Sequence, residues 1–161
     1  MTITGADGTK VTASSDGSTM TVTDDKGVTS TLNTDKSGNM TVKDGKGGEV
    51  EIGGGNVSEG DLGVAFYPGS TEVGMGTSKI EDAEKSFVTC VRTSKDEPSK
   101  VLEFYQSKVM NPSQASTGSG QMKSAQISGK LADGGEIAIA ATKDGDKETQ
   151  IMITVRRDKK K

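Results

Sequence analysis

The first 55 residues contain an internal repeat, and this repeat restricts the fold more than any other feature of the sequence. Similar segments begin at Met1, Met20 and Met40, which places the copies 19 and 20 residues apart. Each copy starts with Met-Thr and a β-branched residue, and continues into a turn rich in Gly and Asp. A repeat of this length holds one supersecondary unit, here strand–turn–strand–turn. We therefore expect about six antiparallel strands in residues 1–55.

Within each unit, apolar residues alternate with Thr or charged residues. Met20 and Val22 point to one side of the expected strand, and the flanking threonines point to the other. The result is a sheet with one Thr-rich face and one apolar face, which must be buried against the rest of the chain or a second copy of it. The apolar face is expected to contain Ile3, Met20, Val22, Leu32, Met40, Val42, Val50 and Ile52.

A second unit is expected over residues 57–158, after a Gly-rich linker at 53–56 and before a basic tail at 159–161. Its helix is predicted over residues 97–110, because Pro98 suits a first helical turn and Asn111-Pro112 suits a stop. Between these signals an apolar stripe recurs at helical spacing, formed by Val101, Leu102, Tyr105 and Val109.

Strands are predicted before and after this helix. One covers residues 86–93, and three more cover 126–131, 136–142 and 150–156, while 113–120 is typical of a polar loop. The order is β-α-β-β-β, an antiparallel sheet with one packed helix. The whole chain is therefore predicted to be an α+β protein dominated by strands, with a hairpin-repeat sheet at its N-terminal end.

Composition excludes several classes of function. The chain has no His, so the usual general base near neutral pH is missing, and the single Cys90 sits in a strand-like run as a buried thiol. The net charge of −3 argues against nucleic acid as a partner. No apolar stretch approaches 18 residues, so we expect no membrane span, and nothing in the sequence indicates a cofactor.

One segment approximates a calcium-binding loop. Oxygen-bearing residues alternate and are followed by a closing acid, which would supply hard ligands for a cation. The first ligand position holds Asn instead of Asp, the closing acid is Asp instead of Glu, and the flanks are strand-like, so a polar hairpin turn explains the same residues. We predict no metal site, and a calcium-stabilised surface protein stays open as an alternative. The candidate ligands are Asn33, Asp35, Ser37, Asn39 and Asp44.

Two clusters of acidic residues raise a second alternative, a hydrolase that uses carboxylates. Both clusters lie in polar, turn-like segments without apolar walls that could raise a carboxyl pKa. Solvated charge is the simpler interpretation, and we expect no catalytic residues. The clusters are Glu81, Asp82 and Glu84, and Asp144, Asp146 and Glu148.

The chain resembles, from about residue 10 to 155, a family of uncharacterised bacterial proteins that are often exported or membrane-anchored. These proteins carry a hairpin-rich segment, then a motif like V-P-x-Y-P-G-A, and then a helix with V-x-x-F-Y. The corresponding run here is 64–70, with Ala65 in the place of the family's Pro, and the helix match is Val101 with Phe104-Tyr105. The resemblance implies an extracytoplasmic location, periplasmic or membrane-anchored.

Together, these features predict a non-enzymatic binding or structural module of the bacterial cell envelope. The apolar face of the repeat sheet predicts self-association, with a homodimer favoured over larger assemblies.

Overall fold

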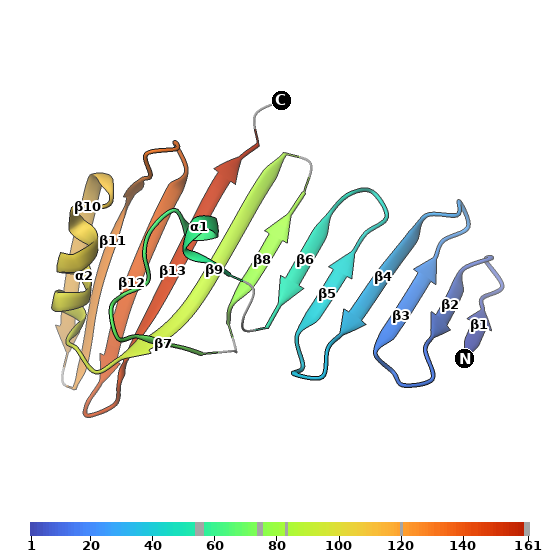
Figure 1. The fold of residues 1–161 in the computed structure, drawn as a ribbon, viewed down its shortest axis with the longest axis horizontal. Coiled ribbons are helices and arrows are strands. Elements are labelled where there is room, and N and C mark those ends of the chain that lie inside the picture. Colours follow the sequence, from blue (N-terminus) through green and yellow to red (C-terminus); the bar gives the residue numbers. More distant parts are fainter. Residues whose placement is uncertain (54–56, 74–75, 83, 120, 160–161) are drawn as a thin grey trace.

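The computed structural model describes residues 1–53, 57–73, 76–82, 84–119 and 121–159 (Figure 1). Its strands form one antiparallel sheet in the order β1-β2-β3-β4-β5-β6-β8-β9-β13-β12-β11-β10, and β7 pairs separately with β9. Two helices lie against this sheet, and the longer one packs on β11 and β12. The predicted α+β class, dominated by strands, is confirmed.

The repeat folds into six strands, as predicted. They form three hairpin units in sequence order, and each strand pairs with its neighbours in the chain. In the turn after β3, the Asp24 carboxylate accepts the N–H groups of Lys26 and Val28 at 3.0 and 2.8 Å, and Gly27 adopts a positive φ of 80°. Such turns need a residue that tolerates positive φ. The strands are β1 (Thr2–Thr4), β2 (Lys10–Ala13), β3 (Thr19–Thr23), β4 (Thr29–Thr34), β5 (Met40–Lys43) and β6 (Glu49–Ile52).

The repeat strands continue directly into the sheet of the second unit. Strand β6 pairs with β8 (Ser78–Glu81), and β8 pairs with β9 (Lys85–Ser94). The apolar face of the repeat was expected to be buried against the rest of the chain or against a second copy. The first of these alternatives is wrong, because the repeat pairs with the second unit edge to edge and its apolar face does not pack on that unit. Residues 54–56 of the expected linker lie outside the described residues.

The second unit contains the other elements. These are α1 (Glu59–Leu62), β7 (Thr71–Glu72), α2 (Pro98–Gln106), β10 (Met110–Ser119), β11 (Met122–Lys130), β12 (Glu136–Asp144) and β13 (Thr149–Asp158). The predicted strands at 86–93, 126–131, 136–142 and 150–156 are all present. Helix α2 begins where expected but ends at Gln106, four residues earlier than predicted, because the chain turns there and enters β10.

The predicted loop at 113–120 is wrong, since residues up to Ser119 belong to strand β10. The segment gave no strand signal because all ten residues of β10 are exposed, so it carries no alternation of apolar and polar residues. Backbone pairing with β11 alone holds it in the sheet. From β9 onward, the order is therefore strand, helix and four strands.

Among the described residues, the core cluster lies on one face of the sheet. Helices α1 and α2 and the segment between α1 and β7 cover this face over β9 and β11–β13 (Figure 1). The side chains at its centre are almost fully buried; examples are Leu62, Val88, Tyr105, Ile127, Ile139 and Ile153. Cys90 belongs to this core at 1% exposure, as expected for a strand thiol, and burial raises its pKa. Val91 of β9 points to the other face, where it is 6% exposed and lies against Gly76.

Candidate functional site: the helix-free face of the sheet

The side of the sheet opposite α1 and α2, called here the open face, carries the apolar side chains of the repeat. Val88 points into the core, so its neighbour Phe87 points to the open face. Phe87 lies opposite Ile80, and Ile80 lies opposite Val50, so all three side chains share that face. The register thus links the repeat to the second unit through one row of apolar residues.

This row, called here the apolar stripe, runs across every strand from β1 to β9 except β7. Its members remain half-buried or exposed; Val22 is 37% and Ile3 is 55% exposed. In β1–β6 and β8, all of which are fully described, no charged side chain lies on the open face. The stripe consists of Ile3, Val11, Met20, Val22, Leu32, Met40, Val42, Val50, Ile52, Ile80 and Phe87.

The opposite face of β5, β6 and β8 is polar and carries ion pairs. Lys43 pairs with Glu49 across β5 and β6 at 3.2 Å. Lys79 of β8 pairs with Glu81 at 3.4 Å and with Asp61 of α1 at 3.1 Å. This face therefore presents charged and polar side chains to solvent, whereas the open face presents apolar ones.

Methionine is concentrated on the open face. Six of the seven methionines belong to the described residues, and the register puts all six on this side of the sheet. Methionine side chains are flexible and polarisable, and they are enriched in protein interfaces. Five of them are 41–82% exposed, while Met40 is half-buried. They are Met1, Met20, Met40, Met110, Met122 and Met152.

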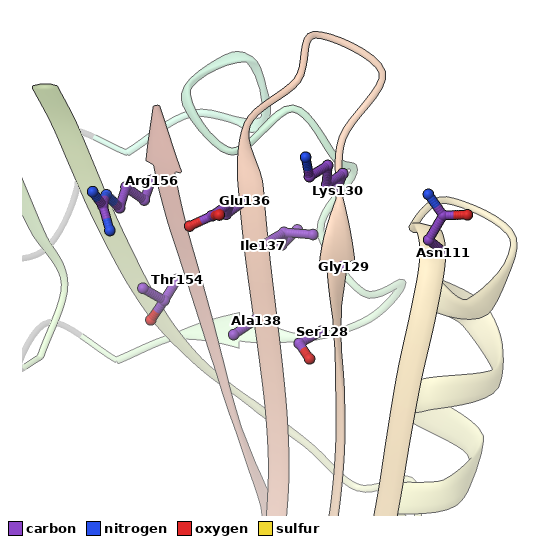
Figure 2. A pocket seen from close by; sticks show the side chains of 9 residues that line it. All are labelled: Asn111, Ser128, Gly129, Lys130, Glu136, Ile137, Ala138, Thr154 and Arg156. Atoms are coloured by element: carbon purple, nitrogen blue, oxygen red, sulfur yellow. The ribbon is translucent and has the colours of Figure 1, made fainter. Parts of the chain in front are cut away.

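The open face of the second unit is hollowed. A cavity of about 500 Å³ lies over β11–β13, where small side chains occupy neighbouring positions. Figure 2 shows Ser128 and Ala138 at its floor, with charged and polar side chains at the end of the strands. A second hollow of about 140 Å³ continues along the same strands toward Met152. The first cavity is lined by Asn111, Ser128, Gly129, Lys130, Glu136, Ile137, Ala138, Thr154 and Arg156.

The candidate calcium ligands form two separate turns. Asp35 accepts the N–H groups of Ser37 and Asn39 at 2.8 and 2.9 Å, and the Asn39 amide donates to it at 2.7 Å. Asn33 instead accepts the Thr19 hydroxyl at 3.0 Å. Asp44 follows β5, at the far end of that strand, so the structure does not bring it to the other candidates.

Asp44 has a turn of its own. Its carboxylate accepts the N–H groups of Lys46 and Gly48 at 2.9 and 2.7 Å, and these bonds hold its pKa below the usual range. Hydrogen bonds from the Asn39 backbone and side chain likewise lower the pKa of Asp35. No group of three or more His, Cys, Asp or Glu in the described part of the chain is arranged to hold a metal ion.

The carboxylates of the first acidic cluster make hydrogen bonds and ion pairs within the chain. Asp82 accepts the N–H groups of Glu84 and Lys85, and these bonds lower its pKa. Glu81 pairs with Lys159, whose hydrogen bond is the main cause of its lowered pKa. A carboxyl that serves as general acid needs a raised pKa, so this cluster lacks the required electrostatics.

The second cluster shows a similar arrangement at Asp144. Its carboxylate pairs with Lys147 at 2.6 Å in the turn between β12 and β13.

The Tyr-Pro-Gly run positions α2. The Tyr67 hydroxyl donates to Asp96 at 2.8 Å, and Lys100 pairs with the same carboxylate at 2.8 Å. Burial and the bond to Asp96 raise the pKa of Tyr67 to about 12. A hollow of about 410 Å³ beside them is lined by these side chains, Pro68, Glu103 and Phe104. The charge of Asp96 is therefore balanced by Lys100. The bond from Tyr67 to Asp96 holds the Tyr-Pro-Gly run against the start of α2.

No protein-family model, curated protein or solved structure matches this chain. None of the helices in the described part of the chain is both long enough and apolar enough to span a membrane. Sequence reasoning placed most apolar residues of the repeat on this face but left out Val11 of β2. It also missed Ile80, Phe87 and Met152, whose place on the open face depends on long-range strand register.

Proposed function

We propose that this chain is a non-enzymatic structural module that binds a second copy of itself through the open face of its sheet. The observation that carries the proposal is the apolar stripe, which shares one face with the described methionines. Within the described part of the chain, no layer packs over this stripe. Exposed apolar surface of this extent is characteristic of interaction sites. The proposal also places the chain in the bacterial cell envelope, and this part of it rests on the family resemblance.

The area of the open face suits a stable dimer. Strands about 4.8 Å apart, with a rise of about 3.3 Å per residue, give this face roughly 1,000 Å² in projection. A standard interface buries about 800 Å² on each partner. Two open faces laid together would therefore bury enough surface, at the separation of about 10 Å that packed sheets adopt.

The open face is suited to a copy of itself. A two-fold axis along the strands near β9 would lay the repeat of one copy over the second unit of the other, so that the apolar stripe meets the hollow above Ser128 and Ala138. Because the stripe contains no charge in β1–β6 and β8, its burial leaves no unpaired ion. The charged residues Glu136 and Arg156 lie at one end of the hollow, where water can still reach them.

The test compares two lysine substitutions on one strand. Val22→Lys places a charge on the open face, whereas Thr21→Lys places the same charge on the polar face of β3. Light scattering at high micromolar concentration should give a mass of one chain for Val22→Lys and of two chains for Thr21→Lys. Equal masses for the two variants, with circular dichroism showing both folded, would contradict the proposal.

A further inference from the structure

Strand β10 forms one margin of the sheet, and its side chains are exposed on both faces. It spans Met110–Ser119 and pairs with β11 on one side only; no strand among the described residues pairs with the other side. All ten residues are exposed, including Gln114 and Ser116, which the register puts on the helix side. Helix α2 packs on β11 and β12, and it leaves the side chains of β10 exposed, so an additional strand can reach the free edge.

The edge lacks the usual protection against pairing with another chain. Natural sheets protect their edges with charged residues, Pro, bulges or short strands. Here Pro112 and the irregular register lie at the start of the strand, between Met110 and Ser113. From Ser113 to Ser119 the pairing with β11 is regular over seven residues, with no charge and no Pro. At the other margin, β1 has only three residues.

We propose that β10 pairs antiparallel with β10 of a second copy, centred on Ser116, and that the sheet continues across the two chains. In such a symmetric pair Ser116 meets its own copy, and Ser113 meets Ser119. Any charged residue near the centre would lie close to the same charge on the partner, which is unfavourable. The run Ser-Gln-Ala-Ser-Thr-Gly-Ser avoids this conflict and has only small or neutral polar side chains.

This contact is independent of the open face. Its two-fold axis is perpendicular to the sheet, so the open face stays accessible when the edges are joined. A seven-residue edge buries much less than the about 800 Å² per partner of a standard interface. The edge contact is therefore short-lived on its own, and a covalent trap is needed to detect it.

Disulfide trapping tests the proposed register. Residues directly opposite in an antiparallel pair have Cα atoms about 4.5–5.5 Å apart, within the range that a disulfide can bridge. Ser116→Cys should form a covalent dimer under mild oxidation. Ser119→Cys is equally exposed on the same strand but would lie about 20 Å from its own copy, so it should stay monomeric. An equal mixture of Ser113→Cys and Ser119→Cys should give the mixed dimer.

The experiment is done with Val22→Lys in every variant, so that association through the open face is absent. The native Cys90 is buried and contributes little background. Faster cross-linking of Ser116→Cys than of Ser119→Cys, by at least about tenfold, supports the proposal, because pairing raises the effective thiol concentration to about the millimolar range. Equal rates for the two variants would overturn it, as would the absence of a cross-link in Ser116→Cys.

Discussion

Ile80 and Phe87 face each other across β8 and β9, on the side of the sheet that carries no helix. They are 40% and 39% exposed, and they join the apolar stripe of the repeat to the open face of the second unit. This pair therefore marks the place where the apolar stripe reaches the strands whose other face forms the core.

The covered face gives a prediction about stability. Leu102 of α2 is 5% exposed within the core, so Leu102→Ala should lower the free energy of unfolding by about 2–5 kcal/mol. Glu103→Ala, on the exposed side of the same helix, should change it by less than about 0.5 kcal/mol. Urea unfolding measures both. Matching midpoints for the two variants would contradict the packing of α2.

Local sequence patterns predicted some of the strands and the start of the helix, but not every element. Alternation of Met and Val with Thr located β3 and β5, and Pro98 located the start of α2. Strand β10 escaped detection because it has no buried side, so no alternation marks it. The pairing of β6 with β8 was not predicted either, because these strands are separated in the sequence by the Gly-rich segment and more than 20 further residues.

The open face itself was predictable only in part. The repeat revealed its own apolar residues, but Phe87 and Met152 stand in strands whose other side forms the core. Their place beside the stripe follows from the register of β9 with β8 and with β13, which no local pattern encodes.

Asp61 gives a prediction about pH. Burial alone would raise its pKa, but bonds from the Ser58 hydroxyl and N–H and from Lys79 lower it to about 2, against 3.8 in the unfolded chain. A lowered folded-state pKa contributes stability above pH about 4 and loses it as the pH falls through about 2. The difference in unfolding free energy between the parent and Asp61→Asn should therefore shrink between pH 5 and pH 2. A difference that does not change with pH would contradict this assignment.

Calcium should leave the protein unchanged. Asp35 already accepts backbone and side-chain N–H groups in its turn, and Asp44 does so in a different turn. We expect millimolar calcium not to alter Tm in a calorimetric scan. A rise of several degrees that disappears in Asp35→Ala would show that the ion binds the folded state.

Oxidation of methionine reports on the open face directly. Met20 and Met152 are 41% and 46% exposed, and a second copy on this face would shield both. With dilute peroxide, sulfoxide should form more slowly at high protein concentration than at low concentration, as measured by peptide mass spectrometry. In Val22→Lys the rates should not depend on concentration. Equal concentration dependence in the parent and the variant would count against shielding by a second copy.

The most direct test of the proposed association is the mass of the parent chain in solution. One chain has a mass of 16.6 kDa, so a dimer through the open face has about 33 kDa. Light scattering should give at least about 33 kDa at high micromolar concentration and approach 16.6 kDa on dilution. A mass of 16.6 kDa at every concentration would contradict the account.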